Sequence, residues 1–245
     1  MGMPITVEIA DSSANQEAFA KVFSYFERVE EQFSVFKNNS EITLINKGLI
    51  KPEYYSEEMK TIFKLAEETK KETNGYFDIV ANNGAFNPSG LVKGWAIYNA
   101  AKILLDMGFK NFYINAGGDI QAYGKNSEGG CWSIGIRDPF DLSKIVKVIY
   151  LKDQGVATSG TYIRGQHIYN PHRRNNSITD LVSFTVIGSN VCEADRFATA
   201  VFAMGREGIK FLENLPGFEG YMIDINGIAT MTSGFKKYTE KPCMI

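Results

Sequence analysis

This sequence of 245 residues contains few of the residue types that build cross-linked or metal-rich folds. It has three cysteines and two histidines, and Cys131, Cys192 and Cys243 lie too far apart to form a Cys-x-x-Cys pair. This pattern excludes a disulfide framework and a zinc ribbon. Apolar runs are also short, and none approaches the ~20 residues that a helix needs to span a bilayer. We therefore expect a globular protein with no membrane span.

Positive charge is not concentrated anywhere in the chain. The formal net charge is −2, and the only dense basic stretch is His172–Arg174. Because binding to a phosphate backbone needs a broad basic face, nucleic acid is disfavoured as the main partner. The N-terminus lacks the basic and apolar regions of a secretory signal, so the expected location is cytoplasmic unless a leader has been removed.

Hydrophobic periodicity predicts four main helices among short strands, without repeats or low-complexity linkers. The predicted helices cover residues 15–33, 56–73, 95–107 and 193–204. The predicted strands cover residues 5–9, 112–115, 132–136, 145–151 and 182–187, with a short extended piece at 76–80 and a terminal hairpin formed by 221–225 and 227–231. The expected fold is a single α+β domain over residues 1–245, with a mixed, largely antiparallel sheet flanked by helices.

Two glycine-containing stretches favour contact with an anionic ligand. Lys93 and Gly94 precede the predicted helix at 95–107, where free backbone N–H groups attract negative charge. Gly117 and Gly118 stand before Asp119 at the end of a predicted strand. Adjacent glycines there indicate a close approach of the backbone, either to a ligand or to another strand.

One pair of oxygen-bearing side chains is suited to a hard cation. Asp195 and Thr199 are four residues apart in a predicted helix, so both project from one helical face. Mg²⁺ binds a few oxygen ligands of this kind and keeps several waters. Surface or capping chemistry is the commoner role of such a pair, so the spacing alone does not establish a metal site.

The stretch from Ala157 to Pro171 contains small hydroxylic residues, two glycines and His167. A histidine beside a glycine-rich loop can exchange protons near neutral pH. A glycine-rich hairpin with a histidine on its surface explains the same residues. His172 lies beyond the Asn170-Pro171 turn and is not expected to contribute.

Taken together, these stretches resemble the ApbE family, whose members are flavin transferases that move FMN from FAD onto a threonine of a target protein. The resemblance runs nearly from end to end. Each stretch is weakly specific, but their shared order is highly specific. After Met1-Gly2, the stretches are Ser34 to Asn46, Gly75 to Asp78, Ser89 to Ala96, Asn115 to Ile120, Gly135 to Pro139, Ala157 to Pro171, and Ala194 to Gly205.

The resemblance implies a role for individual residues. It implies a catalytic role for His167, and ligation of Mg²⁺ by Asp195, Thr199 and the carbonyl of Gly90. Glycines would let the backbone approach the dinucleotide at Gly117, Gly118 and Gly160, next to Asp119 and Ser159. The resemblance places FAD contacts at Met1, Phe36, Tyr76, Phe77, Asp78, Asn87, Lys93 and Tyr169.

Three activities are compatible with these residues. The first is Mg²⁺-dependent transfer of FMN from FAD, the substrate, to a threonine of an acceptor protein, with release of AMP. The second is hydrolysis of FAD to FMN and AMP, with water in place of threonine. The third is FAD binding without catalysis, which departures from the family pattern make conceivable: Phe36 replaces a tyrosine, and Asn87 and Asn170 each replace an aspartate.

Overall fold

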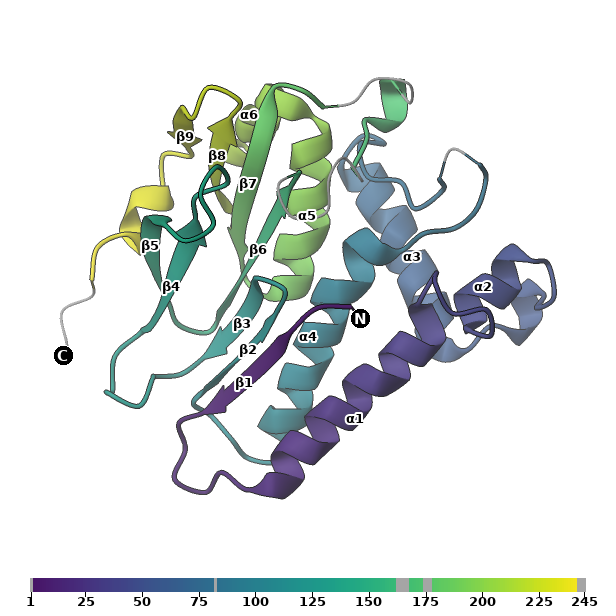
Figure 1. Cartoon of the computed structure of the whole chain (residues 1–245), viewed down its shortest axis with the longest axis horizontal. Helices are drawn as coiled ribbons and strands as arrows, with labels where there is room; N and C mark the ends of the chain where they lie inside the picture. The colour runs from purple at the N-terminus through teal and green to yellow at the C-terminus, as the bar shows by residue number, and fades with distance from the viewer. Residues whose placement is uncertain (1, 82, 162–167, 174–177, 242–245) are drawn as a thin grey trace.

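The chain is organised around one seven-stranded sheet, in the order β1-β2-β3-β6-β7-β8-β9 (Figure 1). The structure is a computed structural model that describes residues 2–81, 83–161, 168–173 and 178–241. Every pair of neighbouring strands in this sheet is antiparallel. The strands are β1 (Ile5–Ile9), β2 (Phe112–Ala116), β3 (Asp119–Tyr123), β6 (Gln154–Gly160), β7 (Leu181–Gly188), β8 (Glu219–Asp224) and β9 (Ala229–Met231). The expected α+β class is confirmed.

Helices cover one face of the sheet, and a two-stranded ribbon covers the other. Helices α4 and α5 pack on the sheet, and α1 packs on α4 (Figure 1). The ribbon is formed by β4 (Trp132–Arg137) and β5 (Ile145–Leu151). The helices are α1 (Gln16–Phe33), α2 (Glu41–Asn46), α3 (Glu57–Glu72), α4 (Ser89–Asp106), α5 (Val191–Ala203) and α6 (Gly208–Glu213), with 3₁₀ turns at η1 (Pro52–Tyr54), η2 (Pro171–Arg173), η3 (Gly205–Glu207) and η4 (Phe235–Tyr238).

The alternation of side chains along the strands divides the core between the two faces. Ala157 of β6 packs with the apolar side chains of α5, whereas its neighbour Val156 packs with the ribbon residues Trp132 and Ile149. Both faces of the central strands are therefore buried. Among the described residues, no helix combines the length and apolarity that crossing a bilayer requires.

Three helices begin directly after a capping residue; α1 and α3 start within one residue of the predicted bounds, and α5 starts two residues before the predicted 193. The side chains of Asn15, Ser56 and Asn190 each accept a hydrogen bond from a backbone N–H in the first turn of α1, α3 and α5. Such caps satisfy donors that have no partner inside the helix. Local sequence therefore sets these boundaries.

The start of α4 differs from the prediction. The helix begins at Ser89, six residues before the predicted start, and Gly90, Lys93 and Gly94 lie inside its first two turns. Glycine and proline lower helix propensity, which is why the stretch resembled a loop. Tertiary packing outweighs that preference, because a Cβ atom at Gly94 would lie 2.6 Å from both the Cβ of Asp195 and the carbonyl oxygen of Val191.

The prediction missed two strands of the sheet, β3 and β6. Gly117 and Gly118 form the turn of the β2–β3 hairpin with φ angles of 62° and 100°, in which Ala116 pairs with Asp119. Positive φ at both turn positions is the reason that glycine is favoured there. These glycines therefore have a structural role in the hairpin turn. Residues 76–80 are not a strand; only Val80 pairs, in an isolated bridge with Phe86.

We expect Gly155→Ala to destabilise the protein by roughly 1–3 kcal/mol, the usual cost of overpacking. A Cβ atom at Gly155 in β6 would lie 1.9 Å from the backbone nitrogen of Val191, the first residue of α5. Gly130→Ala is the matched control, because the nearest atom to a Cβ atom there is 3.7 Å away. Urea unfolding followed by circular dichroism measures both variants, and equal stability would contradict this account of the contact.

Candidate functional site

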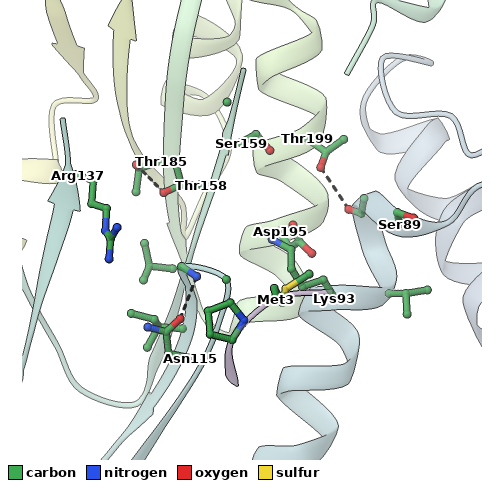
Figure 2. A pocket seen from close by; sticks show the side chains of 18 of the residues that line it. Met3, Ser89, Lys93, Asn115, Arg137, Thr158, Ser159, Thr185, Asp195 and Thr199 are labelled. Atoms are coloured by element: carbon green, nitrogen blue, oxygen red, sulfur yellow. Dashed lines mark hydrogen bonds and ion pairs between the residues drawn. The ribbon is translucent and has the colours of Figure 1, made fainter. Parts of the chain in front are cut away.

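A long cleft of about 2050 Å³ runs between the sheet, the ribbon and the helices. Figure 2 shows part of its wall, where side chains from α4, α5 and the central strands face one another. The wall includes Met3, the end of α1 and the first turns of α4. It also includes the β2–β3 turn, the end of β6 and the inner side of α5. Segments that are far apart in the chain therefore meet in one hollow.

The predicted metal-binding residues lie together where α4 meets α5. The backbone N–H of Gly94 donates to Oδ2 of Asp195 at 2.8 Å. Oγ1 of Thr199 donates to the carbonyl oxygen of Gly90 at 3.3 Å (Figure 2). In a regular helix the N–H of Gly94 would be directed at the Gly90 carbonyl. Two side chains of α5, Asp195 and Thr199, thus bond to the N–H and the carbonyl of this α4 turn.

An ion-pair network surrounds Asp195. The ammonium group of Lys93 pairs with Oδ2 of Asp119 and lies 3.5 Å from Oδ1 of Asp195. The other oxygen of Asp119 accepts a hydrogen bond from the backbone N–H of Thr158 at 3.1 Å. Lys93 therefore links α4 to both β3 and α5.

The electrostatic environment makes Asp195 difficult to ionise. Burial raises the pKa of this carboxyl to about 7, and the neighbouring Asp119 carboxylate adds to the rise. Lys93 and the N–H of Gly94 act in the opposite direction. The charge of Lys93 thus compensates only part of the cost of burying two carboxylates, and an additional cation would favour the ionised form.

The oxygen set at the α4–α5 junction suits Mg²⁺. It comprises one carboxylate, one hydroxyl and one main-chain carbonyl, all hard ligands. Within the described part of the chain, no three histidine, cysteine, aspartate or glutamate side chains cluster as a metal site. A site built mainly by protein carboxylates is therefore not indicated, whereas Mg²⁺ commonly uses one or two carboxylates together with substrate phosphates.

The position of Lys93 corrects one part of the prediction. We expected this lysine at a helix N-terminus, among free backbone N–H groups. It is instead the fifth residue of α4, and its ammonium group faces acids. The negative groups beside Lys93 are Asp119 and Asp195 of the protein itself, not a ligand anion. Any role toward a ligand anion has to operate within this network.

The segment 76–78 lines the cleft with constrained side chains. Phe77 is buried, and its ring lies next to Gly90. Asp78 is paired with Lys70 at 2.9 Å and accepts the N–H of Val80. The hydroxyl of Tyr169 donates to the carbonyl of Val80 at 3.0 Å, so Tyr169 and this segment are joined.

His172 lies closer to the predicted site than expected. Its Nε2 is 2.9 Å from the carbonyl oxygen of Asn74, and its ring contacts Tyr76 edge-on at a centroid distance of 4.5 Å. The imidazole therefore supports an aromatic side chain of the cleft wall. The turn at Asn170, whose Oδ1 accepts the N–H of His172 at 2.9 Å, directs the chain back toward α3.

The other predicted site residues divide into three groups. Phe36 is 94% exposed at the rim of the cleft, where its ring is available to a ligand. Met1 and His167 lie outside the described residues, so the structure does not test them. The remaining predicted residues line the cleft, namely Asn87, Gly117, Gly118, Ser159 and Gly160.

Several residues of the cleft wall were not singled out from the sequence. Arg137 lies at the end of β4, and the hydroxyls of Thr158 and Thr185 are 2.9 Å apart on adjacent strands (Figure 2). The signal for Arg137 was present, because it lies within the Gly135–Pro139 stretch. The threonine pair depends on the β6–β7 register, which could not be predicted while β6 was missing.

Comparison with solved structures defines the class of the fold. The chain superposes on the flavin transferase ApbE from Vibrio cholerae with a TM-score of 0.83 at 23% identity, covering 97% of this chain and 96% of that one. It superposes on the ApbE protein from Thermotoga maritima with a TM-score of 0.86 at 21% identity, covering 98% and 97% of the two chains.

The sequence comparison then assigns the family. The profile of the ApbE family matches residues 1–85 and 80–222, and the chain belongs to that family. A relative named FAD:protein FMN transferase from Vibrio cholerae is 30% identical over 161 residues, which are 62% of this chain and 47% of the relative. The chain spans about half the length of the curated relatives it matches.

Replacing the cation of the network should be costly and pH-dependent. We expect Lys93→Met to destabilise the protein by roughly 3–5 kcal/mol, because it leaves buried carboxylates without their partner. A carboxyl whose pKa is raised on folding loses stability as pH rises through that pKa, so the deficit should be larger at about pH 8 than at about pH 5. Urea unfolding at the two pH values provides the measurement.

Lys70→Met is the control for that variant. It also removes a lysine from a buried acid, Asp78, but Lys70 is 43% exposed and Asp78 keeps the N–H of Val80. Its expected cost is about 1 kcal/mol or less. A deficit for Lys93→Met that does not change with pH would show that carboxylate repulsion is not its cause.

Proposed function

We propose that this protein transfers FMN from FAD to a threonine hydroxyl of an acceptor protein, with Mg²⁺ bound at the α4–α5 junction and AMP as the product released. The observation that carries the proposal is the joint placement of Asp195, Thr199 and the Gly90 carbonyl on the wall of the cleft. Family membership and the names of the relatives support the same reaction.

The reaction breaks the phosphoanhydride bond of FAD and forms a phosphate ester bond to the acceptor. The threonine oxygen of the acceptor forms a bond to the phosphorus on the FMN side of the pyrophosphate, and the bond from that phosphorus to the bridging oxygen breaks. The bridging oxygen leaves with AMP, and the hydroxyl proton passes to a base. His167 is our candidate for this base, and Gly160 and Tyr169, which flank it in the sequence, both line the cleft.

In this proposal, the residues of the α4–α5 junction position the phosphates of FAD and compensate their negative charge. Asp195, Thr199 and the Gly90 carbonyl would hold Mg²⁺, which would supply positive charge to offset the negative charge of the pyrophosphate. Lys93 fixes the carboxylates of Asp195 and Asp119 relative to each other, so the ligand oxygen of Asp195 is in position before FAD binds. Phe36 and Tyr76 provide aromatic surfaces for the ring system of the flavin.

Two departures from the family pattern, Asn87 and Asn170, do not argue for a binding protein without catalysis. Oδ1 of Asn87 accepts hydrogen bonds from the N–H and the hydroxyl of Ser89, and Oδ1 of Asn170 accepts the N–H of His172. In both cases the side chain acts through an oxygen, which asparagine supplies as well as aspartate. The local turns therefore survive the loss of charge.

The deciding experiment follows AMP and covalent flavin together. The purified chain is incubated with FAD, Mg²⁺ and candidate acceptor proteins, AMP is measured by chromatography, and covalent flavin is detected by in-gel fluorescence and mass spectrometry. AMP together with a flavin-labelled threonine supports the proposal. AMP with free FMN identifies a hydrolase, and FAD binding without AMP identifies a binding protein.

The metal prediction is tested by Asp195→Ala. Because this variant removes the only carboxylate of the proposed ligand set, FAD turnover at a given Mg²⁺ concentration should fall by at least about 100-fold. Circular dichroism should show an intact fold, since removing a buried acid leaves Lys93 paired with Asp119. Turnover that stays at the wild-type level would disprove the metal assignment.

The two histidines should affect different quantities. His167→Asn should slow transfer by about 10²–10⁴-fold, as loss of a general base does, while FAD still binds in the presence of Mg²⁺. Wild-type transfer should rise as pH increases through about 6.5, because only the neutral imidazole accepts a proton. His172→Asn removes the ring that contacts Tyr76, so it should weaken FAD binding more than it slows the bound complex. Transfer rates and FAD titrations of both variants separate these outcomes, and identical effects would refute the base assignment.

A further inference from the structure

An arginine next to the proposed metal ligand is buried between two helices. Arg196 follows Asp195 in α5, and its side chain is only 7% exposed. Its Nη1 pairs with Glu72 and donates to Oγ1 of Thr69 at 3.2 Å, while its Nη2 donates to Oε2 of Glu193 at 2.5 Å. The guanidinium group thereby connects the middle of α5 with the end of α3.

From α3, hydrogen bonds lead on to the segment 76–78, which the proposed function places in contact with FAD. The carbonyl of Thr69 accepts a hydrogen bond from Oγ1 of Thr73 at 2.7 Å. The same oxygen of Thr73 accepts the backbone N–H of Phe77 at 3.1 Å, and the ring of Phe77 lies beside Gly90. A chain of short contacts thus leads from Arg196 to the segment 76–78 and returns to the α4–α5 junction.

We propose that Arg196 is a positioning residue that fixes the distance between the oxygens of Asp195 and Thr199 and the flavin-contacting segment 76–78. This inference rests on the proposed function. Asp195 and Arg196 are roughly 100° apart around the axis of α5, so one faces the cleft while the other faces α3. A ligand that binds the metal through its phosphates and the segment 76–78 through its flavin needs both parts at one fixed separation.

Burial of the arginine suits such a role better than a role in stability alone. A buried ion pair repays its desolvation only in part, so it contributes more to a defined geometry than to the free energy of unfolding. The planar guanidinium group donates to two helices in a fixed fork, which a lysine cannot reproduce. Phe197 completes the enclosure, with the guanidinium carbon 4.4 Å from its ring centroid.

The consequence is thermodynamic coupling between the metal and FAD. If Arg196 sets the separation, Mg²⁺ strengthens FAD binding in the wild type, and part of this gain is lost when the link is broken. We expect Arg196→Met to reduce the Mg²⁺-dependent gain in FAD affinity by roughly 2- to 30-fold, the range for residues that couple two sites. FAD affinity in EDTA should stay within about twofold of wild type.

The experiment measures FAD affinity by flavin fluorescence after rapid mixing, with Mg²⁺ and with EDTA, together with thermal unfolding. Glu72→Gln weakens the same link by removing the charge of the acceptor on α3, at a half-exposed residue, and it tests the proposal if Arg196→Met does not fold. Arg206→Met is the control, because Arg206 also pairs with a buried acid, Asp224 of β8, at 2.7 Å. Neither residue belongs to the cleft wall. Arg206→Met should leave the Mg²⁺-dependent increase in FAD affinity unchanged.

The outcomes separate the two proposals. A selective loss of the Mg²⁺ gain in Arg196→Met and Glu72→Gln, absent in Arg206→Met, supports the positioning role. Equal weakening of FAD binding in Mg²⁺ and in EDTA, or a gain that both variants retain, overturns it and leaves Arg196 a stabilising residue. If the wild-type protein does not bind FAD at all, the proposed function fails instead.

Discussion

The arrangement of the site depends on the ammonium group of Lys93. This single cation lies between Asp119 on β3 and Asp195 on α5, and it belongs to α4. It therefore joins three elements that are far apart in the sequence at the position where the sheet and helices enclose the cleft. Burying two carboxylates near each other is unfavourable unless a cation accompanies them, so the charge balance and the geometry of the site have the same origin.

Glycine makes this arrangement sterically possible. Gly94 lets α5 approach α4 closely enough for the N–H of α4 to reach the carboxylate of Asp195, and Gly155 lets the first turn of α5 approach β6. The amide oxygen of Gln121 then accepts the N–H of Val191 at 2.8 Å, which fixes the beginning of α5 above β3. Close packing at the two glycines thus brings the polar groups of Asp195 and Gln121 within hydrogen-bond distance, and these bonds in turn hold α5 against α4 and β3.

Local sequence predicts the parts of the structure that local interactions determine. The predicted starts of α1 and α3 agree with the structure within one residue, that of α5 lies two residues too late, and the side chains of Asn15, Ser56 and Asn190 cap the three first turns. The spacing of Asp195 and Thr199 likewise predicts a shared helical face, and the structure directs both at α4, Asp195 to the N–H of Gly94 and Thr199 to the carbonyl of Gly90.

The features that the sequence alone did not predict depend on tertiary contacts. Strand β6 contains small residues and glycine, and it is a strand because β3 and β7 pair with it on both sides. The start of α4 was placed too late, since packing against α5 outweighs the low helix propensity of its glycines. The burial of Arg196 depends on how α3 meets α5, which periodicity within either helix does not reveal.

The contact at Gly94 also bears on how this chain and its relatives can diverge. A homologue with any side chain at this position has to move α5 away from α4, because the added carbon would overlap with the Cβ of Asp195. Such a movement separates the oxygens of α5 from the Gly90 carbonyl. Substitution at this one small residue is therefore tied to the whole oxygen set, whereas exposed positions such as Val146 of β5 and Phe140 of the β4–β5 loop can vary without moving α5. Evolutionary change in the family should accordingly be rare at the junction of the two helices.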